Sequence, residues 1–286
     1  MKPRGSTLAL ALAVVVAACS NAGSTTSPSA PAEPSADPSV AALSSAPSAA
    51  GGELTIFAAA SLKNMLGEAE TAYEAANPGT DLTISTDSSA ALETQIEQGA
   101  PADVFLSADT TNPQKLVDAG LTSGKAVPFA GNKLTVIVPT DNPAAIQSAA
   151  DLAKPGLRII AAGDEVPITK YATQLVENLA AEADDPAGFA AAYVANVASK
   201  EDNVSSIVSK VALGEGDAGI VYVTDAASSD EVSAIAVPAA ANVPATYAGV
   251  VVGESPNQEA AAAFLEWLTG AEGQAVLSSS GFLPPP

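Results

Sequence analysis

The sequence predicts an α/β fold built on mostly parallel sheets. Runs of β-prone residues alternate along the chain with segments in which apolar residues recur at the i, i+3, i+4 spacing of an amphipathic helix. Several of these runs end in small or hydroxyl residues just before a helix begins, as in residues 54–62. Strands that alternate with helices are typical of parallel sheets, in which ligands bind at the carboxyl ends of the strands.

The first half of the folded region begins with an expected strand at residues 53–57 and a helix that starts at Ser61. Ser61 is expected at or close to the helix N-cap, where a Ser hydroxyl commonly accepts a bond from the backbone. The N–H groups of a helix start also attract anions, so this turn is a candidate anion site. Further strands are expected at residues 81–85, 103–107 and 133–139, and further helices at 91–96, from Asn112-Pro113 onward and at 148–153.

The second half continues the same alternation to the C-terminus. Strands are expected at residues 157–161, 196–198, 218–223, 232–237 and 247–252. Helices are expected from Pro167 onward, at 186–194, at 201–211, at 258–269 and in a last segment that ends near residue 278. Tyr222 stands near the end of an apolar strand, a position that taken alone is typical of a core residue.

Composition excludes several classes of function. The chain has 286 residues, which suffices for one large or two small domains, and it contains no His. Without His, neither Ser-His-Asp nor Cys-His catalysis nor a His-based metal site is possible. The formal net charge of −21 argues against nucleic acid as a partner, because such binding depends on Lys and Arg.

The N-terminus has the pattern of an export signal. Lys2 and Arg4 precede an apolar segment at residues 8–18 that is too short for an ordinary membrane-spanning helix. This segment ends in Val16-Ala17-Ala18-Cys19, which resembles the lipobox of bacterial lipoproteins. The resemblance implies a signal peptide at residues 1–18, lipidation of Cys19 and an anchor on the outer face of the cell membrane. The alternative is an ordinary secretory signal with an incidental Cys.

Residues 19–50 are expected to be a disordered linker behind the lipid anchor. The segment consists almost entirely of Ser, Ala, Pro, Thr and Gly. Such a composition buries too little apolar surface to offset the entropy of folding.

Six motifs spread over residues 53–282 carry a resemblance to one family. They lie at residues 57–62, 95–105, 107–109, 163–171, 219–222 and 281–282, and the most specific are Ala-Ala-Ser-Leu and Gly-Ala-Pro-Ala-Asp. Together they resemble the molybdate-binding receptors of bacterial ABC importers. The resemblance implies the two-lobe periplasmic-binding-protein (type II) fold, in which each lobe is a mostly parallel sheet flanked by helices and a hinged cleft holds the ligand.

The same resemblance implies the domains and the activity. Lobe I would comprise residues 51–130 plus 245–286, and lobe II residues 131–244. The protein would be a monomeric receptor rather than an enzyme, and would deliver molybdate, and also tungstate, to an ABC transporter permease. It would need no cofactor, and molybdenum would be bound only as the oxyanion.

In this family, hydroxyls and backbone N–H groups hold the oxyanion. On matching positions these are the Ser61 and Ser89 hydroxyls and N–H groups, the N–H groups of Ile168 and Val204, and the Tyr222 hydroxyl. Ser88 is a further candidate, because the register between the two adjacent serines is open. A dianion offers only acceptors, so a site made only of donors suits it chemically.

Two positions depart from the family pattern. Asp87 stands where a small neutral residue is common, and we expect its carboxylate to point to solvent or to cap a turn, away from a dianion. Residues 167–169 are Pro-Ile-Thr in place of Pro-Ala-Gly, so Thr169 offers an extra hydroxyl. The neighbouring Lys170 is expected on a solvated helix face.

Other interpretations remain open from the sequence. The ligand could be sulfate, phosphate or another small oxyanion. A serine hydrolase using Ser61 or Ser89 would lack both His and a Gly-x-Ser-x-Gly elbow. The chain could also be a lipid-anchored interaction protein without a small ligand. Asp103 and Asp109 flank an expected strand and could form a cation site, although acidic residues at strand ends commonly cap turns.

Overall fold

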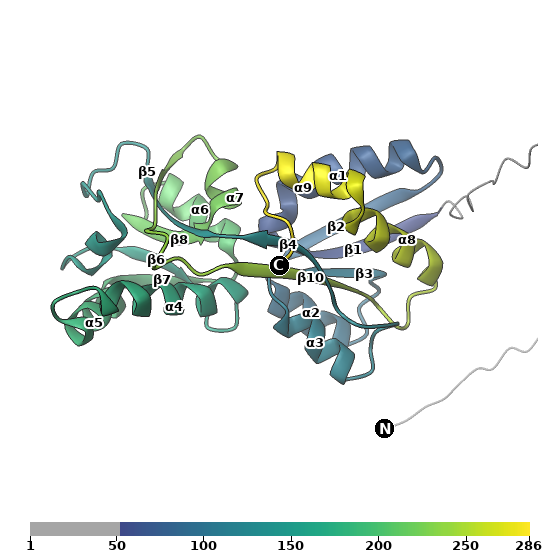
Figure 1. Ribbon diagram of the computed structural model, residues 1–286, viewed down its shortest axis with the longest axis horizontal. Helices are drawn as coiled ribbons and strands as arrows, with labels where there is room; N and C mark the ends of the chain where they lie inside the picture. The colour runs from purple at the N-terminus through teal and green to yellow at the C-terminus, as the bar shows by residue number, and fades with distance from the viewer. Residues whose placement is uncertain (1–51) are drawn as a thin grey trace, which may run out of the picture. The chain divides into compact units, whose positions relative to one another are not determined.

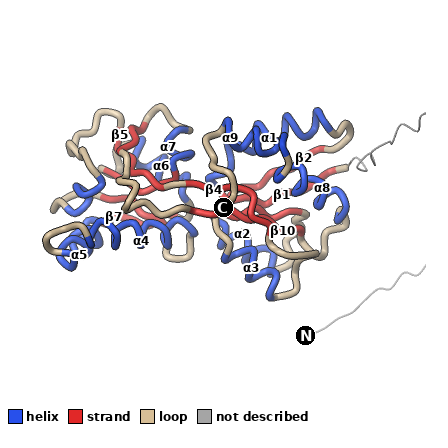
Figure 2. The backbone as a smooth tube through the Cα atoms, viewed as in Figure 1, coloured by secondary structure: helices blue, strands red, loops and turns tan. Residues whose placement is uncertain are grey.

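Two five-stranded sheets flanked by helices make up the part of the chain that the computed structural model describes, residues 52–286 (Figure 1). The strands lie in the middle of each half and the helices outside them (Figure 2). The predicted α/β two-lobe fold is therefore confirmed. The predicted signal peptide, linker and lipidation site at Cys19 lie outside the described residues.

The strands are short and regularly spaced along the chain. Their bounds are β1 Glu53–Ala59, β2 Asp81–Asp87, β3 Val104–Ser107, β4 Val127–Asn132, β5 Leu134–Pro139, β6 Ile159–Ala162, β7 Val197–Glu201, β8 Ala218–Tyr222, β9 Val232–Ile235 and β10 Ala245–Val251.

Helices fill most of the connections between strands. Their bounds are η1 Ala60–Leu62 and η2 Ala149–Ala153, both 3-10 helices, and α1 Lys63–Ala76, α2 Ser89–Glu97, α3 Thr111–Asp118, α4 Pro167–Ala181, α5 Pro186–Asn196, α6 Val204–Ala212, α7 Val223–Ala227, α8 Gln258–Thr269 and α9 Ala271–Ser279.

Each sheet is mostly parallel with one reversed strand. The orders are β2-β1-β3-β10-β4 and β7-β6-β8-β5-β9. In the first sheet β10 runs antiparallel to both neighbours, and in the second sheet β5 does the same. The chain passes to the second sheet between β4 and β5 and returns between β9 and β10. The domain boundaries expected at residues 130 and 244 stay predictions.

The alternation of side chains along β1 explains how helices cover both faces of the first sheet. Leu54 and Ile56 pack in the larger core cluster with residues of α1 and α8, whereas Phe57 packs in a second cluster with Leu92 and Ile96 of α2. In Figure 1, α2 and α3 accordingly lie on one face, and α1, α8 and α9 on the other. Burial of both faces is typical of strands in α/β sheets.

Gly219 allows α6 to approach β8 closely. A Cβ atom at this position would lie 2.5 Å from Ile207 Cγ2, which is closer than packed atoms approach. Val204, at the start of α6, and Tyr222, at the end of β8, line the same cavity. The Gly in the Gly-Ile-Val-Tyr motif therefore has a packing role.

The structure contains two elements that the sequence pattern did not indicate, β4 and α7. β4 includes Pro128 and Gly131, residues that weaken a strand pattern, and it pairs only with the antiparallel β10 within its sheet. α7 has five residues, too few for a helical period to be visible. No helix within residues 52–286 is long and apolar enough to cross a membrane.

Asp103, which ends the Gly-Ala-Pro-Ala-Asp motif, ties three segments of the first sheet together. It is buried, and its Oδ2 accepts a bond from the Thr55 N–H at 2.7 Å. Its Oδ1 accepts from the Ser255 hydroxyl and from Asn257 Nδ2. The carboxylate is therefore fully engaged in holding β1 against the connection from β10 to α8.

We predict that Asp103→Ala destabilises the fold by about 2–4 kcal/mol, because it leaves buried donors without an acceptor. Urea unfolding measures this change, and Asp118→Ala is the matched control, since Asp118 is exposed and accepts only a surface bond from Gln114. Equal unfolding free energies for the two variants would contradict this role for Asp103.

Candidate functional site

A small pocket lies where the carboxyl ends of strands from both sheets meet the starts of helices. Its cavity volume is about 10 Å³, the space of one water-sized sphere. The residues that line it are Ala59, Ala60, Ser61, Ser88, Ser89, Ala108, Val166, Pro167, Ile168, Asn203, Val204 and Tyr222. The structure thus brings all six candidate residues, Ser61, Ser88, Ser89, Ile168, Val204 and Tyr222, to one pocket. Their role in binding a ligand remains a prediction.

Ser61 lies directly before Leu62, the N-cap of α1, as expected, but the expectation that its side chain caps that helix was wrong. β1 continues to Ala59, which is the N-cap of η1, and Ser61 lies in the middle of this 3-10 turn. No side chain caps either η1 or α1. The buried Ser61 Oγ instead lies 3.0 Å from the Tyr247 Oη. Its hydroxyl is therefore held by β10 rather than by its own helix.

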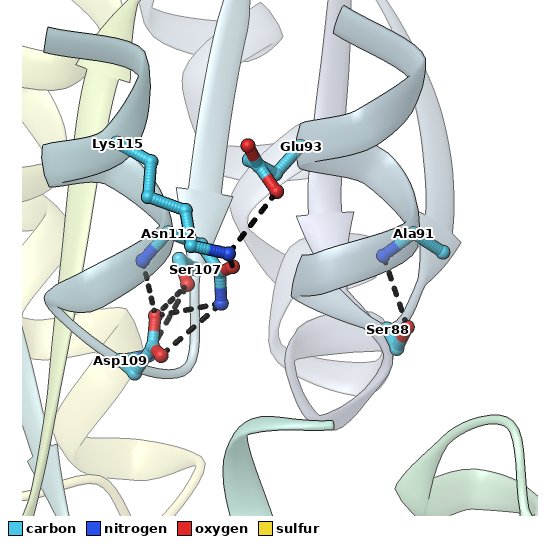
Figure 3. A network of polar contacts seen from close by, with 7 residues as sticks. All are labelled: Ser88, Ala91, Glu93, Ser107, Asp109, Asn112 and Lys115. Carbon is cyan, nitrogen blue, oxygen red and sulfur yellow. Dashed lines mark hydrogen bonds and ion pairs between the residues drawn. The ribbon is translucent and has the colours of Figure 1, made fainter. Parts of the chain in front are cut away.

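The two adjacent serines have different roles at the start of α2. Ser88 is the N-cap, and its Oγ accepts a bond from the Ala91 N–H at 3.2 Å (Figure 3). Ser89 Oγ accepts from the Ala108 N–H, at the end of β3, at 3.1 Å. Because each oxygen already accepts an N–H, each hydroxyl hydrogen is left to donate to another group.

Three helices begin at the pocket, and the first N–H groups of a helix lie at its N-terminal end without intrahelical partners. Ser89 is the first residue of α2, Ile168 the second of α4 and Val204 the first of α6. The N–H groups at these positions have no partner within their helices, and the helix dipole adds a partial positive charge there. Pro167 at the first position of α4 is well suited to a helix start. Such convergence favours a negatively charged ligand.

The Tyr222 hydroxyl is a buried donor without a protein partner. The residue is 1% exposed, and its oxygen has no hydrogen-bond partner within residues 52–286. Burial raises the pKa of Tyr222 well above its usual value, so the hydroxyl keeps its proton. Leaving such a group unpaired costs free energy. This cost is recovered if a ligand in the pocket accepts the bond.

The immediate wall of the pocket is electrically neutral, and Asp87 lies just behind it. None of the lining residues that the structure describes is charged. Asp87 Oδ1 accepts from the Ser88 N–H at 2.7 Å and from Asn203 Nδ2 at 3.2 Å. Asp87 therefore caps its turn, as expected, but it faces the start of α6 rather than open solvent. This bond joins the two sheets beside the pocket.

Thr169 and Lys170 do not contribute to the pocket. The Thr169 hydroxyl donates to the Gly163 carbonyl at 2.7 Å, which corrects the suggestion that it serves the ligand. Lys170 is exposed, in agreement with a solvated helix face. No basic side chain of the described residues therefore lines the pocket.

The Asp109 carboxylate accepts hydrogen bonds from neighbouring protein groups and does not form a cation site with Asp103. It accepts bonds from the Ser107 hydroxyl at 2.7 Å and from the N–H and side-chain amide of Asn112 at 3.1 Å (Figure 3). Lys115 beside it pairs with Glu93 at 3.5 Å. Within residues 52–286, no group of three or more His, Cys, Asp or Glu residues is placed to hold a metal ion.

Sequence reasoning missed two residues of the site region, Asn203 and Tyr247. Asn203 lines the pocket and is the N-cap of α6, and its Oδ1 accepts from the Ser206 N–H at 3.1 Å. An Asn directly before a helical period is a recognisable capping signal, so it could have been found. Tyr247 lies in the middle of an apolar strand, where nothing in the local pattern separates it from the core.

Asp225 is a buried carboxyl directly behind Tyr222. Its Oδ2 accepts from the Tyr222 N–H at 3.1 Å, and burial raises its pKa to about 7. An unfolded Asp ionises near pH 4, so between about pH 4 and pH 7 the folded chain holds a proton that the unfolded chain has released. In that window the contribution of Asp225 to stability falls as the pH rises, and above pH 7 it levels off.

We predict that Asp225→Asn removes this pH dependence. Asn keeps an acceptor for the Tyr222 N–H but does not ionise, so the variant should gain stability relative to the natural chain from pH 5 to pH 7. The gain is at most about 1.4 kcal/mol per pH unit. Urea unfolding at pH 5, 6, 7 and 8 measures it, with the exposed Asp230→Asn as control. Parallel curves for Asp225→Asn and the natural chain would show that Asp225 is already ionised at pH 5.

Comparisons with known proteins place the chain in a family. A family model described as "Bacterial extracellular solute-binding protein" matches residues 54–283. The molybdate-binding protein ModA of Mycobacterium tuberculosis is 35% identical over 233 residues, which cover 81% of this chain and 85% of that protein.

Solved structures agree on the fold. The periplasmic molybdate-binding protein of Azotobacter vinelandii superposes with a TM-score of 0.70 at 24% identity, covering 82% of this chain and 100% of that one. The sulfate-binding protein SubI of Mycobacterium tuberculosis superposes with a TM-score of 0.72 at 23% identity, covering 81% and 86%. The family model and the 35% identical relative are those of solute-binding proteins, which are non-enzymatic transport receptors, so the prediction of a non-enzyme is confirmed. The chain belongs to the bacterial extracellular solute-binding proteins.

Proposed function

We propose that this protein binds molybdate in the pocket between the two sheets and delivers it to the permease of an ABC importer. The observation that carries the proposal is an uncharged pocket at three helix starts, into whose lining the Tyr222 hydroxyl is buried without a partner among the described residues. The relative that is 35% identical is a molybdate-binding protein, which supports the same ligand.

A wall with hydroxyl and N–H groups and no carboxylate favours an oxyanion that carries no proton. Molybdate, tungstate and sulfate offer acceptors on every oxygen, whereas phosphate near neutral pH keeps a proton that needs an acceptor. Asp87, the nearest carboxylate, is engaged with Ser88 and Asn203 and does not line the pocket. Phosphate is therefore disfavoured. Sulfate remains the alternative, and it differs from molybdate mainly in size.

Neutral donors are numerous enough to hold a dianion. The hydroxyls of Ser61, Ser89 and Tyr222 and the N–H groups of Ile168 and Val204 would each contribute about 1.5–3 kcal/mol to a charged ligand. Their sum, roughly 8–15 kcal/mol before the costs of desolvation and closure, is comparable to the about 12 kcal/mol of a nanomolar complex. Lys or Arg is not required.

The donors come from both sheets, so the ligand would link the two halves of the protein. Ser61 and Ser89 follow strands of the first sheet, whereas Ile168, Val204 and Tyr222 belong to the second. Two protein bonds already join the halves beside the pocket: Asn203 donates to Asp87, and the Ser205 hydroxyl donates to the Ala60 carbonyl at 3.4 Å. A ligand that adds bonds on both sides would favour the closed form.

The expected lipobox at Val16-Ala17-Ala18-Cys19 supports an exported and anchored receptor. We propose that it is exported, anchored through a lipid on Cys19, and monomeric, and that tungstate is a second ligand because it is also a tetrahedral dianion. A serine hydrolase finds no support, because Ser61 pairs with Tyr247 and Ser89 with the Ala108 N–H, and neither is a general base.

The ligand is tested by thermal unfolding of the full chain with molybdate, tungstate, sulfate or phosphate. Molybdate at 100 times its dissociation constant should stabilise the folded state by about 2.7 kcal/mol, which raises the Tm by roughly 5–10 °C for a protein of this size. A rise in Tm with sulfate and none with molybdate would show that the ligand is sulfate and contradict the proposed one. No rise in Tm with any of the four oxyanions would overturn the proposal.

Tyr222→Phe tests the pocket itself. We predict that it weakens molybdate binding by about 10-fold to 100-fold, the equivalent of one bond to a charged group. Because the Tyr222 hydroxyl has no partner within residues 52–286, the unliganded variant should unfold at the same Tm or higher. Titration calorimetry measures the affinity, and Tyr73→Phe, on α1, is the control for loss of a buried phenol hydroxyl. Unchanged affinity in Tyr222→Phe would exclude this hydroxyl from the site.

A further inference from the structure

Ser61 can serve an oxyanion only if its hydroxyl hydrogen is free to point into the pocket. The hydroxyl has one hydrogen, and its Oγ lies 3.0 Å from the Tyr247 Oη, where either oxygen could be the donor. If Ser61 donates to Tyr247, its oxygen faces the ligand with lone pairs and repels it. If Tyr247 donates to Ser61, the Ser61 hydrogen is available to the ligand. The direction of this one bond therefore decides whether Ser61 attracts or repels an anion.

The orientation of Asn132 fixes that direction. Asn132, the last residue of β4, is 1% exposed, and its Oδ1 accepts a bond from the Lys133 N–H at 2.8 Å. An amide rotated by 180° would place two donors against each other, so the oxygen must lie on the Lys133 side. Nδ2 then points the other way, toward Thr224 Oγ1 at 2.9 Å and Tyr247 Oη at 3.5 Å.

Tyr247 therefore accepts on one side and donates on the other. An amide nitrogen has hydrogens and no lone pair to offer, so the Tyr247 oxygen that faces it must accept. The Tyr247 hydrogen is left for Ser61 Oγ. The ring has little freedom to turn away, because it is fully buried and makes edge contacts with Tyr222 and Phe282 at centroid distances of 5.5 and 5.4 Å.

We propose that Asn132 and Tyr247 are positioning residues that make Ser61 a donor to the bound oxyanion. Neither lines the pocket, so they act through Ser61 and not by touching the ligand. The inference rests on the proposed function, because it assigns a role to these residues in the same site. It also explains why a Tyr is buried in β10 with its hydroxyl directed at the Ser61 turn.

The positioning of Ser61 by Asn132 and Tyr247 should affect the preference of the pocket for molybdate over phosphate. We call the chain of hydrogen bonds from Asn132 through Tyr247 to Ser61 the relay. With the relay intact, Ser61 presents only a hydrogen to the ligand, which suits an oxygen without a proton. Without the Tyr247 hydrogen, Ser61 is free to rotate and to accept a proton from a ligand such as hydrogen phosphate. Loss of the relay should therefore reduce the preference for molybdate over phosphate, which a loss of packing alone would not do.

A double-mutant cycle tests whether Tyr247 acts through Ser61. Molybdate affinity is measured by calorimetry on the full chain, on Tyr247→Phe, on Ser61→Ala and on the double variant. We expect Tyr247→Phe to weaken binding about threefold to tenfold, the range for one neutral hydrogen bond, and to have less than about a twofold effect when Ser61 is already Ala. An equal loss in both backgrounds would overturn the relay.

A second variant keeps the test valid if Tyr247→Phe perturbs the fold. Asn132→Asp has the same shape but places a carboxylate oxygen next to Tyr247, which would draw the Tyr247 hydrogen away from Ser61. We expect a larger loss of molybdate affinity than in Tyr247→Phe, and the loss should again shrink in the Ser61→Ala background. Affinity equal to that of the natural chain would contradict the relay.

The outcomes separate this inference from the proposed function. If the natural chain binds no molybdate, the proposed function fails before the variants are compared. A second outcome is that the natural chain binds molybdate and Tyr222→Phe binds it more weakly, but the double-mutant cycle shows no coupling between Ser61 and Tyr247. That outcome supports the pocket as the molybdate site and contradicts the relay.

Discussion

The site depends on hydrogen-bond donors that are buried at helix starts and strand ends around one pocket. Strand ends from two sheets bring three helix starts to one point, and the N–H groups there have no intrahelical acceptor. Tyr222 adds a buried hydroxyl to which no residue of the described part of the chain is hydrogen-bonded. A protein ordinarily avoids such groups because each costs free energy. Their convergence in one small pocket is the reason to expect a ligand that consists of acceptors, and it accounts for the absence of basic side chains among the lining residues.

The same constraint explains residues that never reach the pocket. A serine hydroxyl is left to give its hydrogen to the ligand when its oxygen receives a hydrogen from a protein donor. Ser88 and Ser89 receive theirs from the N–H groups of Ala91 and Ala108. Ser61 has no such N–H within its turn and receives a hydrogen from Tyr247, which Asn132 orients. The acidic surface of the chain opposes an anion only weakly, because salt screens it over about 8 Å.

The sequence predicted the fold better than the details of the site. Amphipathic periods such as that of α1 and buried runs such as β8 are local signals, and the structure has them within a few residues of the expected bounds. β4 was not predicted, because Pro128 and Gly131 interrupt the run of β-prone residues that indicates a strand. The local pattern marks the Ser61 turn as a candidate anion site, whereas the other five pocket residues were placed by family resemblance, and no local pattern could have joined Ser61 to Tyr222. The capping role of Ser61 was wrong because the strand extends into a 3-10 turn, and Asn132 and Tyr247 act through contacts between segments far apart in the sequence.

The central claim is that one oxyanion binds between the two sheets, held by donors from both. A crystal structure of the molybdate complex, with anomalous data collected at the molybdenum absorption edge, tests it most directly. The account predicts a single strong anomalous peak within about 4 Å of Ser61 Oγ, Ser89 Oγ and Tyr222 Oη, the separation expected for a central atom whose oxygens accept these bonds. A peak elsewhere on the protein, or a pocket without one in crystals grown with molybdate, would contradict it.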